Sequence, residues 1–292
     1  MQEYENRFIE FISNFESKKE KFDYSDFISN CLRLLSYYAD RDPEIIDNKI
    51  FNIENKLLNY KEDLRLDKFK KCITYISIAY QFKHELGIKF DKIYNNSEIN
   101  SRKFNGVFYT DFHLSSKLNE DIVNKFACNI KDNKELVSST YLEPCAGIGV
   151  FVFTYIDAIA KALRENVKNI KPFLEECISN IYISDNDVEA LEILKKILIL
   201  YVKYYYDISI DIEELEKNIW DKGLIFYSEN NHFYRQNIKK IFPRVFKERG
   251  GFDIVTTNPP YVLLKSNRSK FENKEEYLIH RNWNKELSTL IK

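Results

Sequence analysis

The chain has 292 residues, 44% hydrophobic and 30% charged, which is typical of folded globular proteins and excludes a disordered chain. Its 44 basic and 45 acidic residues nearly cancel, so any nucleic-acid contact must depend on local basic patches. No apolar run spans a bilayer and no signal peptide is visible. We therefore expect no membrane contact. Five dispersed cysteines without a C-x-x-C pair predict reduced thiols, no zinc site and a cytoplasmic protein.

Residues 1–100 are predicted to form an all-helical amino-terminal domain. Apolar residues recur at helical spacing between residues 22 and 90. Asp23 or Ser25 is placed to cap the first helix, and Gly87 to end the last one. The polar, aperiodic segment 95–101 marks the domain boundary.

Beyond that boundary, short β-rich runs alternate with longer helical ones. This pattern predicts an α/β domain over residues 101–292, with a parallel sheet covered by helices. The expected strands are 139–143, 180–184, 232–235 and 252–257. The expected helices are 150–166, 188–206 and 212–222, the last of them an extra helix before the third strand.

A glycine turn follows the first expected strand. Gly147 and Gly149 allow a tight turn and a close approach of a ligand to the backbone, and the next helix presents free amide groups. The third glycine of a dinucleotide motif is replaced by Val152, so the turn favours another nucleoside-containing cofactor. An ordinary strand-to-helix turn is the alternative.

Asp185 ends the second expected strand, beside this turn. An acid in that position can accept hydrogen bonds from both hydroxyls of a ribose. Asp187 stands where the following helix begins and is the better cap. We therefore assign Asp185 to the ribose and Asp187 to the helix cap.

The tetrapeptide Asn258-Pro259-Pro260-Tyr261 follows the last expected strand, at the edge of the sheet where α/β folds bind ligands. The Asn258 side-chain oxygen and the Pro259 carbonyl can both accept hydrogen bonds from one planar amine, and Tyr261 can stack on the ring that carries it. This arrangement suits alkylation of the amine. A turn is the alternative, because Asn-Pro-Pro is also turn chemistry.

In this order, the motifs resemble those of S-adenosylmethionine-dependent DNA adenine methyltransferases of the gamma class, as in type IIG restriction-modification enzymes and type I modification subunits. The resemblance implies a Rossmann-like methyltransferase sheet, S-adenosylmethionine as cofactor, double-stranded DNA as partner and no metal. It implies catalysis by Asn258, Pro259, Pro260 and Tyr261. It implies cofactor contacts from Phe108, Tyr109, Thr110, Glu143, Pro144, Gly147, Gly149, Asp185 and Asn237.

The chain departs from the family pattern in three places. Asp111 stands where proline is usual, and Asn237 where an acid usually contacts the cofactor adenine. The chain also ends at Lys292, before the remaining strands and the target-recognition region of such enzymes. We therefore expect a sheet that is incomplete at its carboxyl end, from truncation or because a carboxyl-terminal partner chain completes it.

A basic cluster lies between the last two expected strands, and either contact with DNA phosphates or a solvated surface would account for it. It consists of Arg235, Lys239, Lys240, Arg244, Lys247 and Arg249.

Two other functions remain open. Protein glutamine and ribosomal RNA guanine methyltransferases also carry an Asn-Pro-Pro-Tyr motif, although the segment Phe108 to Thr110 favours the DNA enzymes. A non-catalytic assembly subunit that keeps the methyltransferase fold is the third interpretation.

Overall fold

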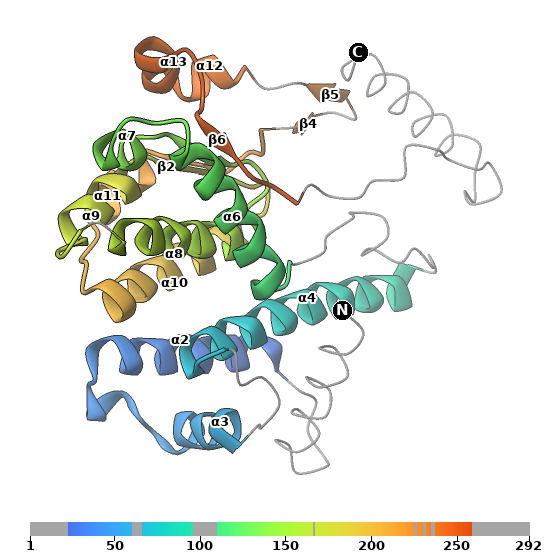
Figure 1. Cartoon of the computed structure of the whole chain (residues 1–292). Helices are drawn as coiled ribbons and strands as arrows, with labels where there is room; N and C mark the ends of the chain where they lie inside the picture. Colours follow the sequence, from blue (N-terminus) through green and yellow to red (C-terminus); the bar gives the residue numbers. More distant parts are fainter. Residues whose placement is uncertain are drawn as a thin grey trace.

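The computed structural model describes residues 23–59, 66–95, 110–165, 167–224, 227–229, 232–234 and 237–258. These ranges form a mixed α/β structure, mostly helical, arranged in layers around a small parallel sheet (Figure 1). None of the helices in them is both long and apolar enough to cross a membrane.

The amino-terminal part is helical, as predicted. Its elements are α2 (Tyr24–Asp40), the 3-10 helix η1 (Pro43–Ile45), α3 (Asn48–Asn59) and α4 (Lys68–Asn95). Asp23 caps α2 by accepting hydrogen bonds from the amides of Ser25 and Asp26. The prediction that Gly87 ends the last helix is wrong, because α4 continues through it. A single glycine inside a helix costs only about 1 kcal/mol relative to alanine, which the packing of a long helix can offset.

The second part alternates helices and strands. Its elements are α6 (Phe112–Ala127), α7 (Asn133–Val137), β1 (Tyr141–Glu143), α8 (Val150–Arg164), α9 (Lys171–Ser179), β2 (Ile181–Ser184), α10 (Val188–Tyr206), α11 (Ile212–Glu216), β3 (Ile219–Trp220), β4 (Tyr227–Glu229), β5 (His232–Tyr234), α12 (Ile238–Ile241), α13 (Pro243–Arg249) and β6 (Ile254–Val255).

Four parallel strands form the main sheet, in the order β3-β2-β1-β6. From β1 the chain moves to one side for β2 and β3, and then returns to the other side of β1 for β6. A crevice opens at such a reversal, and in open α/β sheets ligands bind there, at the carboxyl ends of the strands.

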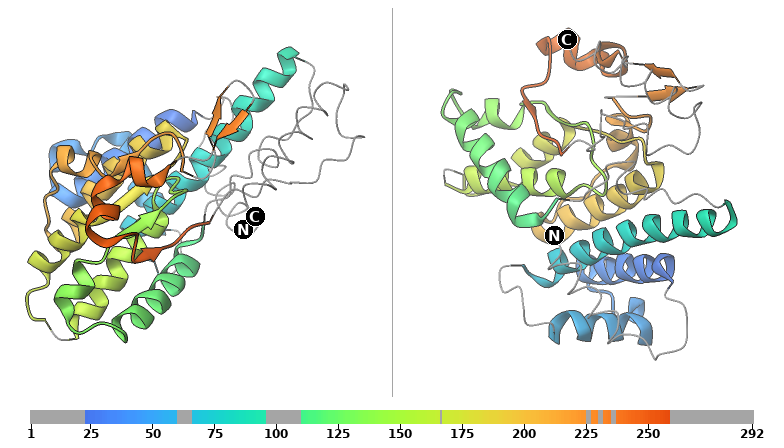
Figure 2. Two further views of the ribbon diagram at one scale, coloured as in Figure 1. Left: turned by 90° about the horizontal axis from the view of Figure 1, so that it is seen from above. Right: turned by 90° about the vertical axis from the view of Figure 1, so that its right-hand side faces the viewer.

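The two faces of the sheet pack against different layers, because successive side chains of a strand point to opposite faces. Tyr141 of β1 and Ile183 of β2 belong to a large core that also includes α8, α10, α2 and α4. Leu142 and Tyr182 point to a smaller core with α12 and α13. Figures 1 and 2 show the resulting order of layers, with α2, α3 and α4 farthest from α12 and α13.

The third predicted strand is confirmed as a strand, but its expected place in the parallel sheet is wrong. Residues 232–234 form β5, which pairs antiparallel with β4 in a separate sheet. The third strand of the main sheet is β3, which lies inside the segment predicted as helix 212–222. Helix α11 stops at Glu216, and the Ile183 amide of β2 then donates a hydrogen bond to the Asn218 carbonyl (3.0 Å). Pairing with β2 thus overrides the local helical pattern.

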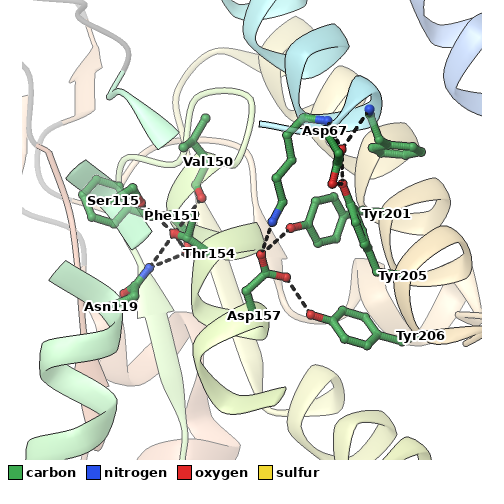
Figure 3. A network of polar contacts seen from close by, with 12 residues as sticks. Asp67, Ser115, Asn119, Val150, Phe151, Thr154, Asp157, Tyr201, Tyr205 and Tyr206 are labelled. Atoms are coloured by element: carbon green, nitrogen blue, oxygen red, sulfur yellow. Dashed lines mark hydrogen bonds and ion pairs between the residues drawn. The ribbon is translucent and has the colours of Figure 1, made fainter. Parts of the chain in front are cut away.

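Helix α6 was not predicted, and it packs on α8 through buried polar contacts. The Asn119 side chain donates hydrogen bonds to the Phe151 carbonyl (2.9 Å) and to Thr154 Oγ1 (2.8 Å), and the Ser115 and Thr154 hydroxyls lie 2.7 Å apart (Figure 3). Asp111 is the cap of α6, since it accepts hydrogen bonds from two amides of the first turn. Capping therefore explains the acid at this position.

A second polar network joins the amino-terminal helices to the α/β part. The Asp157 carboxylate on α8 pairs with Lys70 of α4 (2.5 Å) and accepts hydrogen bonds from the hydroxyls of Tyr201 (2.8 Å) and Tyr206 (2.6 Å) on α10 (Figure 3). One continuous hydrophobic core also spans both parts. The predicted domain boundary near residue 100 lies outside the described residues and stays a prediction.

We predict that Asp157→Ala lowers the free energy of unfolding by about 2 kcal/mol, because it leaves the Lys70 ammonium partly buried without its partner and removes two hydrogen bonds. Asp121→Ala is the control, since Asp121 pairs with Lys117 on an exposed helix face (3.2 Å). Exposed pairs of this kind contribute about 0.5 kcal/mol or less. Urea unfolding of both variants measures the difference, and equal losses would contradict a structural role for the Asp157 network.

Candidate cofactor and catalytic site

The carboxyl ends of the four parallel strands meet at one edge of the sheet. Pro144 follows β1, Asp185 follows β2, Asp221 follows β3, and Asn258 lies three residues after β6. Of the residues assigned from sequence to cofactor binding and catalysis, those that the structure describes at the ends of β1, β2 and β6 therefore lie around the point where the strand order reverses.

The turn after β1 depends on its two glycines. Gly147 and Gly149 both have positive φ angles (52° and 98°), which residues with a side chain rarely adopt. A Cβ atom on Gly149 would also lie 2.7 Å from the Leu194 side chain of α10. Gly149 therefore lets the start of α8 approach α10 closely.

Asp185 is bound to this turn. Its Oδ2 accepts a hydrogen bond from the Gly147 amide (2.7 Å), and its Oδ1 accepts one from the Asp187 amide (2.9 Å). Burial raises the pKa of Asp185, and these backbone hydrogen bonds oppose the rise. Each carboxylate oxygen has two acceptor sites, so this geometry is compatible with further bonds to ribose hydroxyls. Asp187 caps α10 through the Ala190 amide (3.1 Å), as predicted.

Glu143 ends β1 and is completely buried. Its Oε1 accepts a hydrogen bond from the Cys145 amide (3.1 Å). Burial raises the pKa of Glu143 to about 8. The Cys145 amide and the Thr257 hydroxyl oppose the rise, although no hydrogen bond of normal geometry joins Thr257 to the carboxyl group. The carboxyl is therefore mostly protonated at neutral pH.

Four buried polar atoms at this edge have no hydrogen-bond partner among the described residues. They are Glu143 Oε2, Ser184 Oγ, Trp220 Nε1 and Thr257 Oγ1, from the ends of all four strands. Buried polar groups in folded proteins are almost always hydrogen-bonded, so such a group calls for an explanation. A polar ligand at the edge would satisfy them, and S-adenosylmethionine, with its ribose, base and charged amino-acid end, fits this set of donors and acceptors.

Asn258 contacts the segment that precedes α6. Its side-chain Nδ2 donates a hydrogen bond to Thr110 Oγ1 (3.0 Å). The structure thus joins one residue of the predicted catalytic motif to one residue of the segment predicted to bind the cofactor. Phe108, Tyr109 and Pro259 to Tyr261 lie outside the described residues.

Asn237 does not follow the third strand of the sheet. It follows the β4-β5 hairpin and precedes α12, so its predicted contact with the cofactor adenine loses the strand position on which it rested. Asp221 directly follows β3 at the same edge as Asp185. The sequence pattern missed Asp221, because helical spacing extends through this segment.

Two arginines of the basic cluster are paired with nearby carboxylates. Arg249 pairs with Asp253 (3.2 Å), which accepts hydrogen bonds from the amide and hydroxyl of Thr140 just before β1. Arg249 therefore lies at the amino-terminal edge of the sheet, opposite the site. Arg244 pairs with Glu248 within α13 (3.4 Å). The two arginines are thus neutralised locally.

Cys145, in the turn after β1, is not placed to act as a nucleophile. Burial raises the pKa of Cys145 to about 12, so its thiol stays protonated at neutral pH and supplies no thiolate nucleophile.

Over the described ranges, no three His, Cys, Asp or Glu side chains are grouped so that they could hold a metal ion.

Residues 179–289 match the family model of the Eco57I restriction-modification methylase. The matched segment begins just before β2 and includes Asp185, β6 and the Asn258 motif. The match confirms the resemblance to restriction-modification DNA methyltransferases, whereas the gamma class stays a prediction. None of the curated proteins matches the chain.

We predict that the contribution of Glu143 to the stability of the protein falls as the pH rises from about 4.5 to about 8, the range between the ordinary pKa of a glutamate and that of buried Glu143. In this range the unfolded chain has released the proton that folded Glu143 still binds, so raising the pH favours unfolding. Glu143→Gln removes this contribution. The difference in free energy of unfolding between the variant and its parent should therefore change with pH. It should favour the variant by a few kcal/mol more at pH 8.5 than at pH 4.5.

Urea unfolding of both proteins at the two pH values, without cofactor, checks this expectation. Glu176→Gln, which removes an exposed carboxylate from α9, serves as the control. If the stability difference between Glu143→Gln and its parent did not change with pH, Glu143 would not be a buried carboxyl that titrates near pH 8.

Proposed function

We propose that this chain transfers a methyl group from S-adenosylmethionine to the exocyclic amine of adenine in double-stranded DNA, as part of a restriction-modification system. The assignment to a restriction-modification system is based on the restriction-modification methylase match over residues 179–289. The choice of adenine and of the cofactor is our inference from the site. The carboxyl-terminal partner chain stays a prediction.

The position of Asn258 is the observation that carries the proposal. Asn258 stands three residues after β6, and β6 pairs with β1, the strand that leads into the glycine turn. A planar amine held there would lie beside the groups that fit the cofactor. This neighbourhood supports transfer between a cofactor and an amine within one crevice.

The cofactor would be held by the edge described above. Asp185 would accept hydrogen bonds from the ribose hydroxyls, and Gly147 and Gly149 would allow close approach of the backbone. Buried Glu143 would face the charged amino-acid end, where a nearby ammonium group would favour its ionised form. When bound, S-adenosylmethionine supplies an electrophilic methyl group on a sulfonium.

Asn258 would orient the target amine. Its hydrogen bond to Thr110 engages Nδ2, and Oδ1, on the other side of the amide group, would accept a hydrogen bond from the amine. The Pro259 carbonyl would accept the second amine proton, so that the nitrogen lone pair points to the methyl group. The base must first leave the DNA stack to reach this position, where Tyr261 would stack on it.

We predict that Asn258→Ala lowers the rate of methyl transfer by at least about 100-fold and leaves cofactor affinity unchanged. The lost hydrogen bond strengthens as positive charge develops on the nitrogen, so the loss should appear in kcat. Transfer of labelled methyl groups to an adenine-containing duplex in single turnovers measures it. Thr110→Ser keeps the hydroxyl and should keep most of the rate, whereas Thr110→Val should not.

Asn129→Ala is the matched control, because this asparagine is exposed beyond the end of α6. A normal rate for Asn258→Ala would contradict the mechanism. Transfer to a protein glutamine or to RNA, with none to DNA, would keep the mechanism and change the substrate. Cofactor binding without transfer to any acceptor would favour a non-catalytic subunit.

We also predict that Asp185→Ala weakens S-adenosylmethionine binding at least about tenfold, because hydrogen bonds to a charged acceptor are worth about 1.5 to 3 kcal/mol each. Isothermal calorimetry measures the affinity. Asp211→Ala is the control, since Asp211 accepts a similar backbone hydrogen bond at the start of α11 (Glu213 amide, 2.9 Å). Equal affinities of Asp185→Ala and its parent would rule out the ribose assignment.

A further inference from the structure

Helix α4 of the amino-terminal part reaches the start of α10, next to the cofactor edge. Tyr80 of α4 is fully buried, and its hydroxyl lies 2.8 Å from both carboxylate oxygens of Asp187. One turn further along α4, Lys83 pairs with Glu189 in the first turn of α10. Two contacts from α4 therefore hold the residues that begin α10.

The first of these contacts continues into the cofactor site through hydrogen bonds. The Asp187 amide donates to Asp185 Oδ1 (2.9 Å), and Asp185 Oδ2 accepts from the Gly147 amide (2.7 Å). An unbroken series of hydrogen bonds thus runs from Tyr80 through both aspartates to the glycine turn. A displacement of Asp187 would change the position of the Asp185 carboxylate.

Charge adds a second link between Tyr80 and Asp185. The Asp187 carboxylate lies close enough to Asp185 to disfavour the ionised form of its carboxyl group. A hydrogen bond from the Tyr80 hydroxyl stabilises the negative charge on Asp187. It also makes the Asp187 carboxylate oxygens weaker acceptors for other donors. Without it, Asp187 would be less firmly held in the orientation in which its amide faces Asp185.

We propose that Tyr80 is a positioning residue for the cofactor: through Asp187 it sets the Asp185 carboxylate, so the amino-terminal helices form part of the cofactor site. This inference rests on the proposed function, because it assumes that Asp185 binds the ribose. It gives residues of the helical part a role that the sequence pattern of that part does not indicate.

The same two helices contain a matched control. Tyr205 of α10 places its hydroxyl 2.6 Å from both carboxylate oxygens of Asp67, and Asp67 caps α4 through the amides of Phe69 and Lys70. Each helix therefore has a capping aspartate that is bound by a tyrosine of the other helix. Only the Tyr80 pair is next to the cofactor edge.

The test compares Tyr80→Phe and Tyr205→Phe in the full chain. Each variant loses one hydroxyl and keeps its ring, so both should fold with a modest loss of thermal stability. Tyr80→Phe should weaken S-adenosylmethionine binding about three- to tenfold, and Tyr205→Phe should leave it unchanged. Calorimetry well below the unfolding temperature measures affinity in the folded protein, which a purely structural role would not alter.

A double-mutant cycle with Asp187→Asn tests the route of the effect. If Tyr80 acts through Asp187, Tyr80→Phe should have little further effect on affinity in the Asp187→Asn background. An undiminished effect there, or equal affinity of Tyr80→Phe and its parent, would overturn the inference and leave the proposed function intact. Failure of the parent chain to bind S-adenosylmethionine would overturn the proposed cofactor, and this inference with it.

Discussion

The parallel pairing of β1 with β2 on one side and β6 on the other is the constraint on which the site depends. Tyr141 of this three-residue strand lies opposite Ile181 and Ile254 at once. Because the three strands run in the same direction, the chain must deliver the glycine turn, Asp185 and Asn258 to one edge. A shift of one residue in either register would turn buried side chains to the wrong face of the sheet.

The large core fixes this register from one side. Tyr141 stacks on Tyr155 of α8 with ring centroids 3.9 Å apart, and Phe153 stacks on Tyr201 of α10 at 5.0 Å. Rings of this size leave few alternative packings. The edge of the sheet contrasts with this interior, because it holds a buried glutamate of raised pKa and several polar atoms that find no partner in the part of the chain that the structure describes. Such groups disfavour the folded state in isolation, which is expected where a site is built for a polar ligand.

Much of the structure could be predicted from the sequence, because the longest apolar patterns coincide with the most buried elements. Helix α10 occupies the predicted residues 188–206, and β1, β2 and β6 lie within the predicted strands. Strand β3 could not be found in this way, since two residues are too few to show a period of two. Its identity depends on hydrogen bonds to β2 that are distant in sequence.

The candidate site also contains some features that local sequence patterns reveal and others that depend on segments distant in sequence. Gly147, Gly149 and Asp185 could be found, because glycines with positive φ and an acid after a strand have local signatures. The contact of Asn258 with Thr110 has no such signature, as it joins residues 148 positions apart. The burial of Glu143, whose Oε2 has no partner among the described residues, likewise depends on the packing of β1 between β2 and β6 and not on its own segment alone.

The reciprocal tyrosine–aspartate pairs of α4 and α10 place a limit on how this protein can change in evolution. Because each residue turns an α-helix by about 100°, an insertion between Asp67 and Tyr80 would rotate one tyrosine away from its aspartate while the other pair stayed in place. Changes in length are therefore excluded from this stretch of α4, although substitutions on its exposed side are not. Relatives that share this arrangement should differ in length in the connections between helices and keep the spacing of the four residues.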